Sequence, residues 1–237
     1  MRDEKAFLTA YRATDYPRPS VAVDLVILTI IDAQLRVLLV KRREHPFKGQ
    51  WALPGGFVRV GETATEQGED LDEAARRELR EETGLDPQRV FLEQLYTFGK
   101  AGRDPRMRVI SVAYYALVRP DLAPFVKAGG DVSDVEWFDV AQLPRLELAF
   151  DHHDVVDMAL ARIRGKLEYA NIAFDLVPAT FTIPELRHVY GIVLGRPMDP
   201  GNFRRSFNRW VQAGRIEQAP GKRITTSKPA AVFRFKR

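Results

Sequence analysis

Nine consecutive residues at positions 77–85, Arg-Glu-Leu-Arg-Glu-Glu-Thr-Gly-Leu, constrain the fold of this chain more than any other segment. On a helix, Glu78, Glu81 and Glu82 stand at positions i, i+3 and i+4 and share one face. Gly84 stands where a glycine commonly ends a helix. Carboxylates this close repel one another, and hard divalent cations such as Mg²⁺ or Mn²⁺ prefer carboxylate oxygens. The alternative is an acidic helix face exposed to solvent.

A longer pattern surrounds this helix. Gly56 ends a Leu-Pro-Gly-Gly turn and is followed after five residues by Glu62, and Glu69 is followed after seven residues by Arg77. The segment resembles the signature of the Nudix hydrolases, Gly-x5-Glu-x7-Arg-Glu-U-x-Glu-Glu-x-Gly-U, in which U is aliphatic. In that signature both halves share one glutamate. Here they use two different glutamates, so the chain carries an insertion around positions 63–68.

The resemblance implies a Nudix α/β/α sandwich that hydrolyses a nucleoside diphosphate linked to a second moiety. In that case Glu78, Glu81 and Glu82 would bind Mg²⁺ or Mn²⁺, and Glu81 and Glu82 would also be catalytic. The family role of Arg77 is to orient one of these glutamates. The candidate general base is Asp131, on a loop before a predicted strand, and a simple turn residue is the alternative there.

Basic and aromatic residues near this region are candidates for binding the ligand. The polar, cationic segment 102–106 resembles the substrate loop of ADP-ribose-specific Nudix proteins, where an arginine can bind a diphosphate through two hydrogen bonds. The loop after the second predicted strand offers further arginines for phosphate and an aromatic ring for adenine. The predicted ligand-binding residues are Arg42, Arg43, Phe47, Gly56, Arg103 and Arg106.

The first 150 residues alternate apolar strands with an amphipathic helix. Strands are predicted at 21–31, 35–40, 51–59, 91–98, 109–118 and 135–138. A helix is predicted at 70–83 with the apolar stripe Leu71, Ala74, Ala75 and Leu79. This pattern predicts a mixed sheet with helices on its faces. A helix at 154–169 would connect it to the rest of the chain, which gives domains at 1–150 and 171–237 and a connection at 151–170.

Charge divides the chain into two parts. Residues 165–237 contain 13 Lys and Arg but 5 Asp and Glu, whereas residues 1–164 contain 23 basic and 27 acidic residues. A basic module of this size indicates a nucleic-acid partner. A solubilising tail is the alternative, but the segment is patterned like a folded domain.

The basic module has the order of a winged helix-turn-helix. Thr182 and Glu185 form a capping box at the start of one helix, and Gly195 follows its end. Asp199 precedes a second helix that extends to about residue 213. A short strand near Ile216, a basic loop at 221–228 and a strand at 230–235 complete the wing.

The second helix presents two different faces. Phe203, Phe207 and Trp210 form its core stripe. Its other face can offer arginine to guanine and asparagine to adenine in a DNA major groove, while wing cations bind phosphates. The predicted DNA-binding residues are Asn202, Arg204, Arg205, Asn208, Arg209, Lys222, Arg223 and Lys228.

A second resemblance covers nearly the whole chain. The segments 181–186, 193–197 and 202–205 resemble the C-terminal domain of Nudix-related transcriptional regulators of the NrtR type. That resemblance implies a homodimer that represses genes of NAD metabolism from a palindromic operator on double-stranded DNA. ADP-ribose bound in the Nudix domain would release the DNA.

The sequence is also compatible with other functions. Related regulators control sugar catabolism instead. The chain could also be an ADP-sugar pyrophosphatase with an accessory basic domain, or an enzyme fused to a dimerisation domain. It has no cysteine and no apolar run long enough to span a membrane, so we expect a cytoplasmic protein without disulfides.

Overall fold

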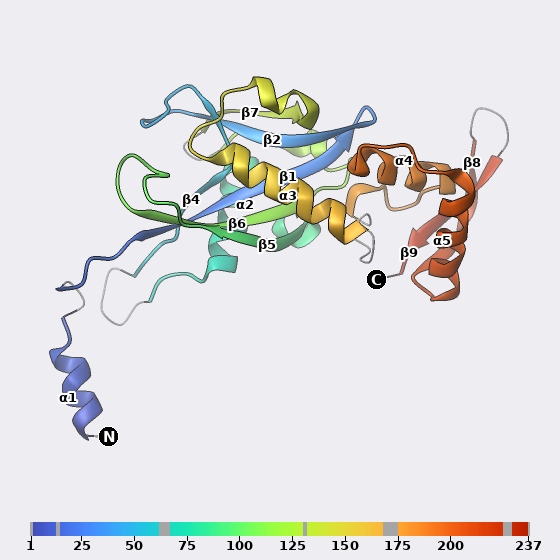
Figure 1. Cartoon of the computed structure of the whole chain (residues 1–237). Coiled ribbons are helices and arrows are strands. Elements are labelled where there is room, and N and C mark those ends of the chain that lie inside the picture. The colour runs from blue at the N-terminus through green and yellow to red at the C-terminus, as the bar shows by residue number, and fades with distance from the viewer. Residues whose placement is uncertain are drawn as a thin grey trace.

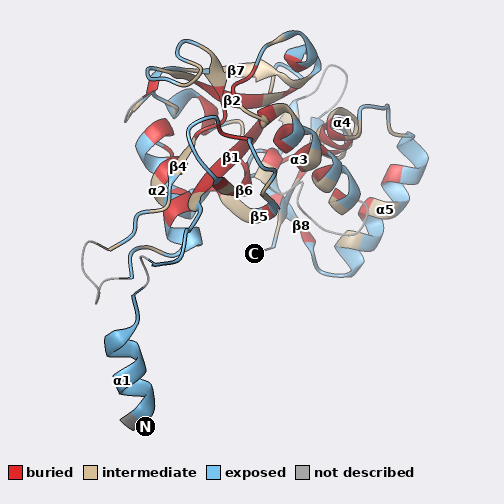
Figure 2. Ribbon diagram, turned by 60° about the vertical axis from the view of Figure 1, so that its left-hand side comes forward, coloured by how far each residue is buried: buried red, intermediate tan, exposed pale blue. Residues whose placement is uncertain are grey.

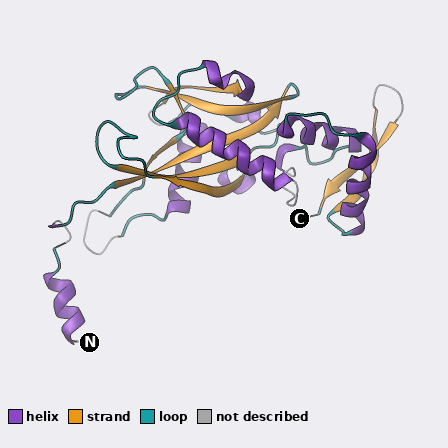
Figure 3. Ribbon diagram, viewed as in Figure 1, coloured by secondary structure: helices purple, strands orange, loops and turns teal. Residues whose placement is uncertain are grey.

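The computed structural model describes residues 2–12, 15–61, 67–129, 132–167, 175–224 and 229–236. A mixed sheet has helices on both faces and is followed by a smaller helical module with a hairpin (Figures 1 and 3). The predicted fold class, an α+β sandwich followed by a winged helix-turn-helix, is confirmed.

The sheet has seven strands in the described part of the chain. They are β1 (Ser20–Ile31), β2 (Gln34–Arg42), β3 (Trp51–Ala52), β4 (Gly55–Phe57), β5 (Phe91–Phe98), β6 (Val109–Leu117) and β7 (Val132–Asp139). Their order is β3-β2-β1-β6-β5, with β4 beside β1 and β7 beside β2. β1 and β6 are parallel, and the other paired strands are antiparallel. Asp32 and Ala33 both have positive φ, as a two-residue hairpin turn between twisted strands requires.

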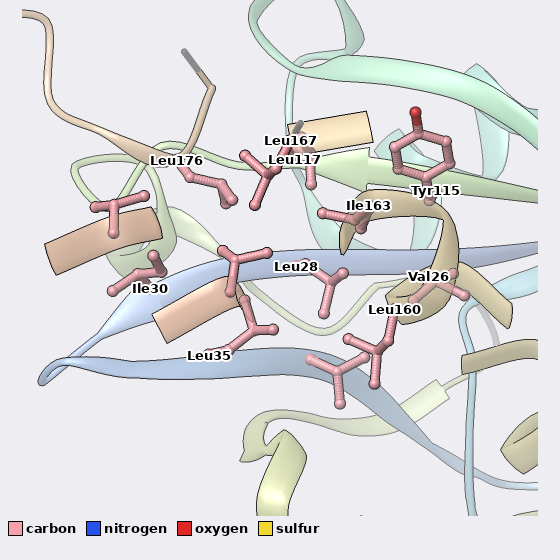
Figure 4. Packing of buried hydrophobic residues seen from close by; sticks show 14 of the residues in the cluster. Val26, Leu28, Ile30, Leu35, Tyr115, Leu117, Leu160, Ile163, Leu167 and Leu176 are labelled. Atoms are coloured by element: carbon pink, nitrogen blue, oxygen red, sulfur yellow. The ribbon is translucent and has the colours of Figure 1, made fainter. Parts of the chain in front are cut away.

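The central strand β1 is buried on both faces. Successive side chains of a strand point to opposite sides. Val26 and Leu28 therefore pack against α3 (His152–Leu167), whereas Leu25 and Ile27 pack against α2 (Leu71–Thr83). Figure 4 shows the side facing α3, where Val26 and Leu28 lie near Leu160 and Ile163. This two-sided burial explains why residues 21–31 are almost continuously apolar.

Helix α2 begins and ends as predicted. Asp70 and Glu73 form a capping box, and Gly84 ends the helix with a φ of 70°. Ala74, Ala75 and Leu79 are fully buried, but the prediction for Leu71 was wrong, since it is exposed. Helical side chains point back towards the N-terminus, so the first residue extends beyond the helix rather than over the sheet.

The C-terminal module contains α4 (Ile183–Leu194), α5 (Pro200–Gln212) and a hairpin of β8 (Ile216–Ile224) and β9 (Pro229–Phe235). The predicted caps are present at the start of both helices and after α4. Phe181 pairs with Phe233 and adds a third segment to the hairpin. The predicted basic loop is partly wrong, because β8 continues across a bulge to residue 224, and residues 225–228 lie outside the described part.

One continuous cluster of buried side chains joins the sheet, α3, α4 and α5. Figure 2 shows this buried interior in red. Helix α3 covers a sheet face as well as leading to the second module, so residues 152–167 of the predicted connection are also a layer of the sandwich, and residues 168–170 lie outside the described part. Helix α1 (Arg2–Ala10) extends away from this body (Figure 1). Short 3-10 helices lie at Pro87–Arg89, Ala123–Phe125 and Val140–Arg145.

Candidate functional site

A cleft of about 580 Å³ lies between β1, the Leu-Pro-Gly-Gly turn, α2, the loop at 99–108 and the start of α3. Its size falls within the range of about 300–1,000 Å³ that is usual for small-molecule sites. The three predicted glutamates of α2 and five of the six predicted ligand-binding residues line it. The structure therefore brings these predicted residues together in one cleft, while their roles in binding stay a prediction.

Arg77 organises the acidic face of α2. Its guanidinium lies 2.6 Å from Glu69, 2.6 Å from Glu78 and 3.1 Å from Glu81. Hydrogen bonds to Glu69 are the main reason why the pKa of Arg77 is raised, and the same bonds lower the pKa of Glu69. Arg77 therefore orients the acidic residues, which agrees with the role that the resemblance implied. Glu69 is the glutamate with which the second half of the signature begins, and the structure places it beside Arg77.

The glycines of the turn allow the backbone to approach these carboxylates. The backbone N–H of Gly55 donates a hydrogen bond of 2.9 Å to Glu82 Oε2. A Cβ atom on Gly56 would lie 2.3 Å from Glu78 Oε1, closer than real contacts allow. Glu78 and Glu82 are buried, whereas the Glu81 side chain is 42% exposed. Glycine at position 56 thus leaves room for the Glu78 carboxylate against the turn.

The predicted metal site is not preformed in this arrangement. Among the described residues, no three His, Cys, Asp or Glu side chains come together where a metal ion could bind. Glu78, Glu81 and Glu82 offer oxygen donors of the right kind. However, Arg77 already neutralises two of them, and Arg59 also lies 3.2 Å from Glu81. Binding of Mg²⁺ or Mn²⁺ therefore stays a prediction, and Asp131 lies outside the described residues.

A buried charged network forms one side of the cleft. The Arg103 guanidinium lies 3.0 Å from Asp24 and 2.6 Å from Asp151. Burial opposes ionisation of Asp24, but contacts with His152, Arg103 and Ser111 outweigh it and lower the pKa of that carboxyl. The prediction that Arg103 binds a diphosphate stays untested, and the structure gives its guanidinium two internal partners instead.

Sequence reasoning missed Asp24, Asp151 and His152 in this network. A single carboxylate inside the apolar run 21–31 was the available signal for Asp24. Asp151 and His152 gave no interpretable spacing, because their partners are distant in the sequence.

The remaining predicted ligand residues differ in position. Arg42 and Arg43 line the cleft, as does Arg106, which pairs with Asp104 at 2.7 Å and remains 40% exposed. Phe47 is not among the lining residues in the described part of the chain. It packs edge-on against Phe150, at 4.8 Å between ring centroids, and Phe150 lines the cleft. Phe150 is therefore the better aromatic candidate.

The predicted DNA-binding face of α5 is exposed. Phe203 and Phe207 are buried and Trp210 is half-buried, which leaves the polar residues on the outer surface. Arg205 bonds to Asn202, and Arg209 donates to Ser206 Oγ at 3.0 Å. The exposed polar residues are Asn202, Arg204, Arg205, Asn208 and Arg209. They form one surface on the outside of the helix, which we call the α5 face.

The wing residues fall into three groups. Lys222 is exposed, and Lys228 lies outside the described residues. Arg223 is instead held within the module, since its Nη1 atom lies 2.6 Å from Glu185 on α4. In the described structure Arg223 is therefore bound to α4 and does not extend the exposed basic surface of the α5 face.

The fold and cleft define a Nudix-type domain joined to a winged helix module. The NUDIX domain family matches residues 21–158, and the NrtR DNA-binding winged helix domain family matches residues 173–235. The chain belongs to the NrtR-type regulators of the Nudix family. No helix in the described ranges combines the length and apolar character needed to cross a bilayer.

Three similar proteins support this assignment. The ADPR responsive transcriptional repressor NtrR of Acinetobacter baylyi is 38% identical over 98% of this chain and 88% of that protein. The ADP-ribose pyrophosphatase of Methanocaldococcus jannaschii is 42% identical over 65% of this chain and 79% of that protein. The structure of Shewanella oneidensis NrtR complexed with a 27mer DNA is 36% identical, with a TM-score of 0.76 over 91% of this chain and 93% of that chain.

Proposed function

We propose that this chain is a transcriptional repressor that binds ADP-ribose in its Nudix domain and double-stranded DNA through its winged helix module. The observation that carries the proposal is the connection of a cation-lined cleft to an exposed basic helix through one continuous core. The names of the A. baylyi and M. jannaschii relatives both specify ADP-ribose, and the S. oneidensis relative was solved with DNA.

In the cleft, Arg42, Arg43 and Arg106 supply positive charge for the diphosphate. Arginine can bind such an anion through paired hydrogen bonds. Gly56 keeps the backbone close to α2, and Phe150 offers a ring on which adenine can stack. Acidic residues of α2 line the same cleft as these arginines, so the cleft has the mixed polarity that a nucleotide sugar requires.

On DNA, the α5 face reads bases and the wing binds the backbone. Arginine pairs with guanine and asparagine pairs with adenine through two hydrogen bonds each. A single α5 contacts one half-site, so a palindromic operator requires a homodimer. The predicted link to genes of NAD metabolism stays part of this proposal.

Fluorescence anisotropy tests the proposal. Labelled DNA from upstream of the gene is titrated with protein, with and without ADP-ribose. We expect sequence-specific binding that ADP-ribose reverses. Weak binding that is indifferent to sequence and lost at modest salt would reflect backbone electrostatics alone and contradict the proposal.

A second activity, hydrolysis of ADP-ribose, is favoured by two observations. Glu78, Glu81 and Glu82 are all retained, and the pyrophosphatase of M. jannaschii is a close relative of the Nudix part. Incubation with ADP-ribose and Mg²⁺ tests it by the appearance of AMP. Absence of AMP would exclude this activity without affecting the repressor proposal. A Glu82→Gln variant as active as the wild type would contradict the assigned site.

A further inference from the structure

The start of helix α3 is hydrogen-bonded to two separate walls of the cleft. Asp151, just before the helix, accepts bonds from Arg103 Nε at 3.0 Å and Nη2 at 2.6 Å. His152, the first helical residue, accepts a bond of 2.9 Å at Nδ1 from the Leu53 backbone N–H. Arg103 belongs to the predicted ligand loop, and Leu53 begins the glycine turn. The position of α3 therefore depends on both walls.

The ion pairs that Arg103 forms with Asp24 and Asp151 are buried, which holds their geometry. The side chains of Arg103, Asp24 and Asp151 are 4%, 11% and 15% exposed. Two carboxylates share one guanidinium, and the paired bonds to Asp151 fix its orientation as well as its distance. Water screens such a buried pair much less than a surface pair. A change in the position of Arg103 therefore moves Asp151 or breaks the hydrogen bonds between them.

The opposite end of α3 contacts the DNA-binding module. Arg164 Nε donates a hydrogen bond of 3.0 Å to the Val193 carbonyl on α4. Ile163 and Leu167 belong to the same buried cluster as Leu186 of α4. A helix of this length extends about 24 Å, at about 1.5 Å per residue. One rigid element thus reaches from the cleft to the helix that precedes α5.

We propose that Asp151 and His152 are positioning residues that transmit ligand binding from the cleft to the winged helix module through α3. This inference rests on the proposed function. A ligand changes DNA affinity only if it binds one arrangement better than another. Arg103 and Leu53 line the same cleft as Arg42, Arg43 and Arg106. A diphosphate held by those three arginines also reaches Arg103, where it competes with Asp151 for the guanidinium, and contact of the ligand with the glycine turn shifts Leu53. Both changes alter the bonds that hold the first turn of α3.

The variant Asp151→Asn tests the bond to Arg103. Asparagine keeps the size of the side chain but lacks the charge that holds the guanidinium. The readout is the ratio of the DNA dissociation constants with and without saturating ADP-ribose, and calorimetry gives ADP-ribose affinity. We expect this ratio, which is about 5–150 in typical allosteric proteins, to fall towards 1 in the variant. DNA affinity without ligand should stay near the wild-type value.

A second variant and a control complete the experiment. His152→Phe keeps a ring but removes both the acceptor for Leu53 and the contact of Nε2 with Asp24 at 3.6 Å, and it should also lower the ratio. Asp121→Asn breaks an ion pair with Arg119, outside the residues that line the cleft, and should keep the wild-type ratio. Asp121 thus controls for loss of an aspartate–arginine pair as such.

The outcomes are distinguishable. If the wild type is not released by ADP-ribose, the proposed function fails. If the wild type is released and both variants keep its full ratio, the positioning role is wrong and the proposed function stands. Complete loss of ADP-ribose binding in both folded variants would also overturn the inference, because these residues would then belong to the binding site itself. If Asp151→Asn does not fold, the ratio of His152→Phe decides.

Discussion

Arg223 on the wing strand β8 is bound to Glu185 at the start of α4, with 2.6 Å between Nη1 and Oε2. Its Nη2 atom also donates to the carbonyl oxygen of Thr180 at 3.0 Å. Burial opposes ionisation of Glu185, but the bond to Arg223 outweighs it and lowers the pKa of the carboxyl. Arg223 thus fixes the wing against the helix-turn-helix, a role that its predicted DNA contact did not include.

Replacement of Glu185 separates these two roles. If Arg223 positions the wing, Glu185→Gln weakens DNA binding by up to about fivefold, since a half-exposed ion pair contributes about 0.2–1 kcal/mol. If Arg223 bound phosphate directly, removal of a nearby negative charge would strengthen DNA binding instead. Anisotropy titrations measure the sign. Glu217→Gln, which removes one charge from the same hairpin and breaks the pair with Arg234, is the matched control.

Two basic residues should differ in how they affect specificity. Arg204→Ala on the α5 face should cost about 1–3 kcal/mol on operator DNA and relax the base preference at one position. Lys222→Ala on the wing should weaken binding to all sequences equally and reduce the salt slope by about 1. Titrations on operator and unrelated DNA at several salt concentrations check both. Equal effects of the two variants on every sequence would contradict the assigned base contact.

A methyl group at Gly56 should disrupt the cleft. The added Cβ would lie 2.3 Å from Glu78 Oε1 and displace the Glu78 carboxylate, which is buried and paired with Arg77. We expect Gly56→Ala to lower the free energy of unfolding by about 1–3 kcal/mol, as overpacking typically does, and to weaken ADP-ribose binding. Denaturant unfolding and calorimetry measure both quantities. Gly99→Ala, whose Cβ would meet nothing within 4 Å, should leave both unchanged.

The Asp24 carboxyl should make folding sensitive to acid. Its pKa is lower in the folded state than in the unfolded state, where aspartate titrates at about 3.9. Its contribution is therefore complete above about pH 4 and is lost as the pH falls from there towards the folded value. Asp24→Asn should flatten that part of the unfolding curve measured between pH 6 and pH 2, at about 25 °C. An unchanged slope would show that other carboxylates dominate the acid response.

Local signals made much of the fold predictable. The capping box at Thr182 and the glycine at position 195 act within one helical turn, so both helix ends could be read directly from the sequence. The two apolar runs at 21–31 and 35–40, separated by a short polar segment, indicated the hairpin of β1 and β2 in the same way. The acidic face of α2 was also predictable, because its spacing follows from helix geometry.

Contacts between distant segments could not be predicted. Asp24, Arg103 and Asp151 meet because β1 and β6 pair in parallel and α3 packs across them, which no short pattern encodes. The sequence alone presents Arg223 as an unpaired cation of the wing, because its partner Glu185 lies 38 residues earlier. The exposure of Leu71 likewise depends on where the helix begins relative to the sheet.

In the proposed function, ADP-ribose and DNA affect each other's binding through one chain. The most direct measurement is the calorimetric affinity for ADP-ribose of the free protein and of the protein saturated with its operator fragment. Thermodynamic linkage requires DNA to weaken ADP-ribose binding by the same factor, about 5–150-fold in typical cases, by which ADP-ribose weakens DNA binding. Equal affinity for ADP-ribose in the free and DNA-bound protein would contradict the account.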